Sequence, residues 1–334
     1  METVRRATIF EVAEAAGVSI TTVSHVFSGK RRVNAQTRSR VMATASRLSY
    51  SPSSTAQALA TGRNFALALQ VSFTGEALIL NPFFASLLPT LSLAAVERGY
   101  SFVYVPPSEE GRSFVDPLLG ERRIDGAVLV DPLLGDPFVE AVREASLPFV
   151  TIGRLLDGSS DVWVDNDHAS ICANVAEHLT SAGYSRPALL SIETDVSYSA
   201  DYVAGFRAAF SDPKRIVIAD AFSAQAATRA AAEALASKDP PDAFFCIHDQ
   251  LALGVEPAIE GAGLRVGRDV GIVAVGDSVI AQQAHVPLSS VNVGTERFGS
   301  ATVALLDELI TGGTPTTPVV VPARLVARTS TVRT

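Results

Sequence analysis

The sequence has few of the residues that stabilise secreted proteins. Only two cysteines occur in 334 residues, Cys172 and Cys246, and they lie in different segments, so no disulfide framework is indicated. No stretch approaches the roughly 18 uninterrupted apolar residues that a membrane-spanning helix needs. The first residues, METVRRATIF, contain no apolar core of the kind found in signal peptides. We therefore expect a cytoplasmic protein that is neither secreted nor membrane-spanning.

The motifs that usually mark catalytic and metal sites are also missing. The five histidines form no H-x-x-x-H pair, and no Cys/His cluster has the spacing of zinc ligands. No G-x-S-x-G nucleophile turn, no P-loop and no G-x-G-x-x-G after the first strand occurs. We therefore predict no enzyme activity, no catalytic residues, no cofactor and no metal, although a triad that meets only in space would leave no such signature.

Net positive charge is confined to one end of the chain. Residues 1–63 hold nine Lys or Arg against three Asp or Glu, whereas the remainder holds 18 against 32, which gives the overall net charge of −8. A basic N-terminal part on an acidic body places a polyanionic partner at the N-terminus and discourages the body from lying on nucleic acid.

The stretch from Thr8 to Ser28 predicts two short helices joined by a tight turn. Thr8 and Glu11 have the spacing of a capping box, Gly17 suits the left-handed end of the first helix, and Ser19 can cap the second. Apolar residues fall on one face of each helix. Two helices crossed at a glycine-containing turn are typical of the DNA-reading helix-turn-helix, the alternative being an ordinary helix pair in a core.

Two further segments extend this N-terminal part. Asn34 can cap a third helix over 35–48, which completes the smallest bundle able to bury the apolar faces. Residues 51–62 then predict about two helical turns, too short to be stable alone in water. This hinge segment should fold only when something packs on it; the alternative is a flexible linker.

Residues 7–62 resemble the DNA-binding headpiece of the LacI/GalR family of bacterial repressors, following the pattern TIxDVAxxAGVSxxTVSxVxxG and its continuation. Weaker similarity continues at 81–84, 164–166 and 287–291. The resemblance implies a homodimer on a near-palindromic operator, with the hinge segment as a helix that drives Leu59 into the minor groove beside Ala56. The DNA contacts it implies are Thr8, Ser19, Ile20, Thr21, Thr22, Ser24, His25, Arg38, Arg40, Ser53, Ala56 and Leu59. The family usually has Arg at the position of His25, so the preferred half-site should differ.

From residue 65 onward, short apolar runs alternate with amphipathic helices in two successive series. Continuously apolar strands separated by helices predict parallel sheets covered on both faces, and two series predict two doubly wound lobes. The expected fold class is a small all-α helix-turn-helix headpiece with an α/β body of two such lobes, similar to periplasmic binding proteins. The expected boundaries are 1–50 for the headpiece, 51–63 for the hinge, 64–161 with 288–322 for lobe 1, and 162–287 for lobe 2.

A ligand of such a body binds between the lobes, at the carboxyl ends of the strands. Strand ends and family positions together give seven candidate residues for an effector site: Phe83, Phe84, Asp165, Tyr202, His248, Asp249 and Asp277. Tyr202 stands where relatives usually have an Arg, and Gly276–Asp277 stands where they usually have two Asp. The loss of the Arg removes a bidentate clamp, which leaves the class of effector open.

The sequence therefore predicts a transcriptional regulator, a repressor whose operator affinity is controlled by a small molecule, with a sugar or sugar derivative as the expected effector. A non-sugar effector such as a nucleoside is the first alternative. A solute-binding protein, or an architectural DNA-binding protein with a vestigial cleft, is the second. The chain has no heptad repeat near its C-terminus, so a dimer rather than a tetramer is expected.

Overall fold

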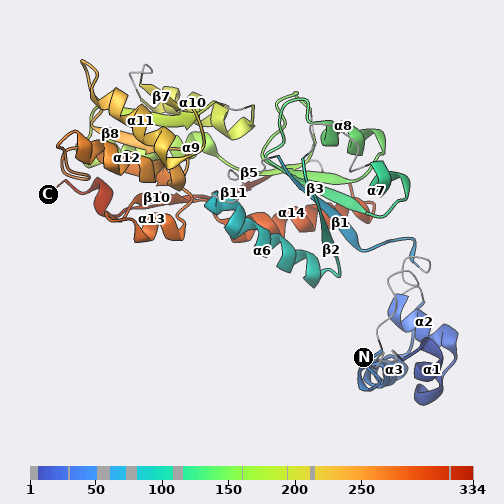
Figure 1. The fold of residues 1–334 in the computed structure, drawn as a ribbon. Helices are drawn as coiled ribbons and strands as arrows, with labels where there is room; N and C mark the ends of the chain where they lie inside the picture. Colours follow the sequence, from blue (N-terminus) through green and yellow to red (C-terminus); the bar gives the residue numbers. More distant parts are fainter. Residues whose placement is uncertain are drawn as a thin grey trace, which may run out of the picture. The chain divides into compact units, whose positions relative to one another are not determined.

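The computed structural model describes residues 7–28, 31–50, 61–72, 81–107, 116–159, 161–193, 195–210, 215–315 and 317–333. The chain forms two compact units, one of residues 1–66 with 122–125 and the other of the remaining residues (Figure 1). No helix in these ranges combines the length and the apolar character that crossing a bilayer requires.

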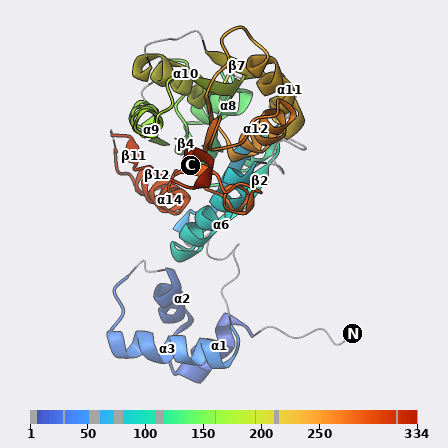
Figure 2. The ribbon, with the colours of Figure 1, turned by 90° about the vertical axis from the view of Figure 1, so that its left-hand side faces the viewer.

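The first unit contains a bundle of three helices (Figure 2): α1 (Ile9–Ala16), α2 (Ile20–Ser28) and α3 (Ala35–Arg47). Thr8 and Glu11 form the expected capping box, and Gly17 ends α1 in the left-handed conformation, with φ of 63°. The Asn34 side chain accepts a hydrogen bond at the start of α3. The core of the bundle consists of Val12, Ala13, Ala16, Val23, Val26, Val41 and Ala45. The predicted helix-turn-helix is therefore confirmed.

The hinge segment, with the predicted DNA contacts Ser53, Ala56 and Leu59, lies outside the described residues. Its helical state remains a prediction. Residues 73–80, between Ser72 and Asn81, also lie outside them.

The described strands of the second unit form two six-stranded sheets. The first sheet has the order β11-β5-β4-β3-β1-β2. Its strands are β1 (Ala66–Val71), β2 (Ser101–Val105), β3 (Gly126–Val130), β4 (Phe149–Ile152), β5 (Trp163–Asn166) and β11 (Val319–Val321). Two helices, α6 (Pro82–Glu97) and α14 (Thr295–Ile310), cover one face, and α7 (Asp116–Gly120) and α8 (Pro137–Glu144) lie on the other (Figure 1).

The second sheet has the order β12-β10-β9-β8-β6-β7, and only its edge strand β12 runs antiparallel to its neighbour. Its strands are β6 (Pro187–Ile192), β7 (Ile216–Ala219), β8 (Ala243–Cys246), β9 (Gly271–Val275), β10 (Ser289–Asn292) and β12 (Arg324–Val326). Figure 2 shows two helices on each face of this sheet: α9 (His168–Ser181) with α10 (Ser197–Ala209), and α11 (Ala224–Leu235) with α12 (Asp249–Gly261). The short helices α13 (Val279–Gln283) and η2 (Thr329–Thr331) complete this lobe.

The two doubly wound lobes are confirmed, but the expected lobe boundaries need correction. Strand β5, expected to open lobe 2, pairs with β4 in the first sheet, and β10, expected in lobe 1, pairs with β9 in the second. The chain therefore passes between the sheets after β5, after β10, and between β11 and β12. The sheet that a strand joins is decided by the strand that it pairs with. The apolar sequence of the strand itself does not specify that partner.

Helices α11 and α12 approach each other closely at Gly254. A Cβ atom built on Gly254 would lie 2.1 Å from the carbonyl oxygen of Ala224 and 2.8 Å from Cβ of Ala227. The Thr228 hydroxyl in addition donates a 2.8 Å hydrogen bond to the Gly254 carbonyl. Only glycine fits at this contact, so this residue sets the distance between the two helices.

The substitution Gly254→Ala should therefore destabilise the protein, because overpacking a tight contact costs about 1–3 kcal/mol. Gly261→Ala is the matched control: it lies at the end of the same helix with no atom within 4 Å of the added methyl group. It should be neutral or slightly stabilising. Urea unfolding followed by circular dichroism measures both, and equal midpoints for the two variants would refute the packing argument.

Candidate functional site

The second unit has a cleft between its two lobes, at the carboxyl ends of strands from both sheets. It encloses about 590 Å³ of space, part of it open to solvent. Asp131 follows β3, Asp165 lies near the end of β5, His248 follows β8 and Gly276 follows β9. The terminal residues of parallel strands from both sheets therefore lie together in this cleft, as expected for a ligand site in this architecture.

Aromatic side chains form much of the cleft wall. Phe83 at the start of α6 meets Phe298 of α14 edge to face, with ring centroids 5.8 Å apart. Tyr198 and Tyr202 of α10 line the same space from the other lobe. Such walls are well suited to the apolar faces of a sugar or a planar base.

Two buried carboxylates face this space with unused hydrogen-bonding capacity. Asp165 accepts one bond from the backbone N–H of Asn166, but its Oδ2 has no partner. No described residue donates a hydrogen bond to the Asp131 carboxylate, which is 8% exposed. Burial raises the pKa of both groups, and for Asp131 the charge of Asp165 raises the pKa further. Among the described lining residues there is no Lys or Arg, so this part of the cleft accepts hydrogen bonds but holds no free cation.

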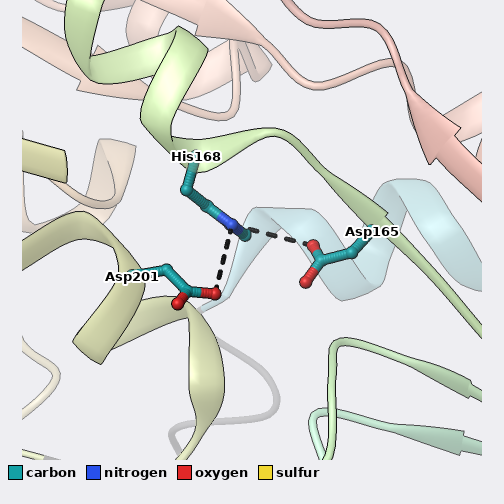
Figure 3. Close-up of side chains that lie close together, drawn as sticks. All are labelled: Asp165, His168 and Asp201. Atoms are coloured by element: carbon teal, nitrogen blue, oxygen red, sulfur yellow. Dashed lines mark ion pairs between the residues drawn. The ribbon is translucent and has the colours of Figure 1, made fainter. Parts of the chain in front are cut away.

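His168 lies between two carboxylates at the edge of the cleft (Figure 3). Its Nε2 faces Asp165 at 3.7 Å and its Nδ1 faces Asp201 at 3.7 Å, both longer than a hydrogen bond. Asp201 is in turn paired with Arg154, which follows β4 of the other lobe. The ring of His168 also packs edge to face on Tyr202. This group of side chains therefore spans the two lobes beside the unpartnered Asp165 oxygen.

His248 and Tyr198 add two further polar atoms without partners. The His248 ring packs edge to face against Tyr198 and Phe222, and its Nε2 and the Tyr198 hydroxyl are both buried with no hydrogen bond. Burial lowers the pKa of His248 to about 3, so the ring is neutral at physiological pH. Unpaired buried polar atoms are costly, and a ligand that hydrogen-bonds them would remove that cost.

Five of the seven residues predicted for the effector site line the cleft: Phe83, Asp165, Tyr202, His248 and Asp249. Phe84 does not, because the next residue along a helix points elsewhere, and its ring is 1% exposed in the core. Asp277 does not either, because its carboxylate binds Arg328 at 2.5 Å and Asn292 at 3.1 Å. These two predicted residues therefore lie outside the cleft lining.

The structure explains the departure at Gly276. The carboxylate of Asp249 lies where a side chain of residue 276 would be, since a Cβ there would come within 2.8 Å of Asp249 Oδ2. Asp249 accepts hydrogen bonds from Ser278 N–H and the Ser290 hydroxyl, at 2.8 and 2.7 Å. It therefore joins the start of α12 to the start of α13 and to β10. His248 occupies the N-cap position of α12, and the helix begins at Asp249.

Sequence reasoning missed several lining residues, chiefly Asp131, Asn166, His168 and Tyr198. Asp131 could have been found, because it directly follows the apolar run of β3, as Asp165 ends that of β5. His168 and Tyr198 could not have been found from the sequence, because they lie on helices whose orientation toward the cleft depends on the packing of the lobes.

The headpiece presents most of its predicted DNA contacts at the surface. Ile20 is 40% exposed at the start of α2, and Thr21, Arg38 and Arg40 are exposed. The Ser19 hydroxyl accepts a hydrogen bond from Thr22 N–H, at 3.1 Å. A shallow hollow beside α2 is lined by Val18, Ser19, Thr22, His25, Arg31, Arg32, Val33 and Thr37. Two arginines absent from the prediction, Arg31 and Arg32, thus adjoin predicted base-reading residues.

Comparison with known proteins agrees with this architecture. Residues 8–53 match the model of the lacI family of bacterial regulatory proteins, and residues 176–331 match a periplasmic binding protein-like domain. The transcriptional regulator CelR of Thermobifida fusca is 31% identical over 98% of both chains. The transcriptional repressor PurR of Photobacterium profundum is 28% identical, covering 91% of this chain and 92% of its own. The chain therefore belongs to the LacI family of helix-turn-helix transcriptional regulators.

Solved structures of the family have the same fold. A complex of the transcriptional regulator CelR with cellobiose matches 97% of this chain and all of its own, with a TM-score of 0.73 and 29% identity. The lac repressor dimer bound to operator and an anti-inducer matches 98% of this chain and all of its own, with a TM-score of 0.79 and 25% identity.

The low pKa of His248 predicts a pH dependence of stability. An unfolded chain protonates this ring near pH 6.5, whereas the folded protein does so only near 3. Below about pH 6.5 the unfolded state binds more protons, so this residue makes the free energy of unfolding fall as the pH falls. In His248→Asn the loss of stability between about pH 6.5 and 4 should be smaller than in the wild type. Urea midpoints across that range measure it, and parallel pH profiles would show that the ring is not held neutral.

Proposed function

We propose that this protein is a cytoplasmic, homodimeric transcriptional repressor whose operator affinity is set by a small molecule in the cleft. Family membership supports the regulatory role over catalysis, because the related proteins are transcriptional regulators. The confirmed helix-turn-helix and the basic N-terminal part support DNA binding, and a near-palindromic operator matches the two-fold symmetry of a dimer.

The effector we propose is an uncharged, hydroxyl-rich molecule, a sugar or sugar derivative. This assignment rests on the composition of the cleft wall. Aromatic faces lie beside two carboxylates with free acceptor oxygens, and there is no Lys or Arg among the described lining residues. Hydroxyl groups donate to carboxylates, whereas a phosphate or carboxylate ligand would face Asp131 and Asp165 without a counterion. CelR, whose complex with cellobiose has this fold, makes a disaccharide the first candidate.

On the DNA side, Ile20, Thr21 and His25 are proposed to read base edges, with Ser24 beside them. His25 can make one hydrogen bond to a guanine where the usual Arg makes two. Thr8, Ser19, Thr22, Arg38 and Arg40 are proposed to fix the headpiece on the phosphates. Arg31 and Arg32 adjoin the same hollow and extend this set. In the hinge, Leu59 with Ala56 beside it keeps the minor-groove role that the resemblance implies, and Ser53 remains a proposed DNA contact.

The proposed mechanism is linkage between two equilibria. A ligand that binds the closed lobes more tightly than the open ones shifts the body toward closure. A hinge segment of marginal stability then converts this shift into a change in operator affinity, because its helix forms or is lost with the spacing of the two copies.

A thermal-shift screen tests the effector assignment. The panel contains cellobiose, other neutral mono- and disaccharides, matched sugar phosphates and purine nucleosides. Neutral sugars should raise the unfolding temperature, since a ligand that binds only the folded state stabilises it by mass action. Shifts confined to the phosphates would refute the assignment, and shifts confined to the nucleosides would establish the alternative effector class.

The variant Asp165→Asn should lose effector binding and keep operator binding. A hydrogen bond to a charged group contributes about 1.5–3 kcal/mol, so effector affinity should fall roughly ten- to a hundredfold. Asp220→Asn is the matched control, because Asp220 is exposed and, among the described residues, pairs with Arg229 alone. Effector affinity is measured by calorimetry with the sugar that the screen identifies, and operator affinity is measured in parallel. Unchanged effector affinity would place the ligand elsewhere.

Headpiece variants should separate phosphate contacts from base contacts. Arg38→Gln should weaken binding to every duplex and lower the slope of log affinity against log salt by about one, whereas Thr21→Ala should change which base is preferred. Arg207→Gln, an exposed arginine of the body, is the control. If Arg38→Gln instead weakened binding to one sequence alone, the two roles would have to be exchanged.

A further inference from the structure

Three side chains of the metal-ligating type converge outside the cleft. Glu256 and Glu260 lie four residues apart on one face of α12, and His285 lies in the connection between α13 and β10. One ligand atom from each residue lies within 4.8 Å of the other two. Glu260 and His285 are exposed, so the group can be reached from solvent.

The Glu256 carboxylate gives a second, independent indication of a missing ligand. Its side chain is 8% exposed, and its Oε1 is buried without a hydrogen-bond partner. Burial raises the pKa of this carboxyl, while the charge of His285 and the backbone N–H of Val286 lower it. A buried oxygen with unused lone pairs is costly, and a cation bound beside it would remove that cost.

The group Asp165, His168 and Asp201 in the cleft has a similar composition but a different geometry. Figure 3 shows the His168 ring between the two carboxylates, with Nε2 toward Asp165 and Nδ1 toward Asp201. The two ring nitrogens point in different directions, and each already faces a carboxylate. Asp201 is also already paired with Arg154. This group therefore belongs to the effector cleft.

We propose that Glu256, Glu260 and His285 form a binding site for a divalent transition metal, represented here by Zn²⁺. Imidazole and carboxylate together suit zinc, whereas Ca²⁺ and Mg²⁺ prefer oxygen ligands alone. Three protein ligands leave one position of a tetrahedral zinc ion for water. The site does not depend on the proposed regulatory function, and a bound ion would join α12 to the segment that leads into β10.

Calorimetric titration of ZnCl₂ into the metal-free, tag-free full-length protein tests the proposal. One Zn²⁺ per chain is expected. Glu260→Gln and His285→Ala should each weaken binding at least about tenfold, since loss even of a group that only supports a ligand costs 10- to 100-fold. The control Glu233→Gln, an exposed glutamate of α11, should bind zinc as the wild type does. Co²⁺ in place of zinc should give visible absorption bands that His285→Ala changes.

Circular dichroism establishes that each variant is folded before its affinity is compared. The proposal is overturned if the wild type binds no zinc, or if Glu260→Gln and His285→Ala both bind as tightly as the wild type. It is also overturned if His168→Asn abolishes zinc binding while His285→Ala does not, because the ion would then lie in the cleft.

Discussion

The amide side chain of Asn166 connects the three segments by which the chain passes between the two sheets. Asn166 ends β5, the first crossing, and its Nδ2 donates to the carbonyl oxygen of Val293 at 3.1 Å and to that of Val321 at 2.8 Å. These carbonyls belong to the second and third crossings. With 9% of its surface exposed, Asn166 makes these bonds shielded from water, where losing them would leave buried carbonyls unpaired. One residue thus fixes the connections about which the lobes can move.

The position of the cleft follows from that constraint. Asp165 precedes Asn166 on the same strand, so fixing the amide also fixes the carboxylate that faces the ligand space. The opposite wall is fixed by Asp249, which joins α12 to Ser278 and Ser290. The polar atoms without partners on Asp165 and on His248, which precedes Asp249, are therefore each held in place within their own lobe before any ligand arrives. A preorganised site of this kind loses little entropy on binding.

Much of the fold could be predicted because its signals are local. The Thr8–Glu11 capping box and Gly17 define the first helix from residues a few positions apart, and continuous apolar runs mark the strands. The sheets to which β5 and β10 belong could not be predicted, because strand pairing joins residues far apart in sequence. The candidate site shows the same division. The ends of the strands identified Asp165 and His248 from the sequence. The position of Asp277 could not be predicted, because its carboxylate pairs with Arg328, which is 51 residues away in the sequence. The convergence of Glu256 with His285 likewise becomes visible only in three dimensions.

Coupling between the cleft and the DNA-binding surface is tested most directly by reciprocity. The affinity for the effector is measured by calorimetry with and without a saturating operator duplex, at one salt concentration. Linkage requires the operator to change effector affinity by the same factor by which the effector changes operator affinity, typically about 5- to 150-fold. We predict equal factors in the two experiments. An effector affinity that the operator leaves unchanged would contradict this coupling, because the cleft would then bind its ligand without acting on DNA.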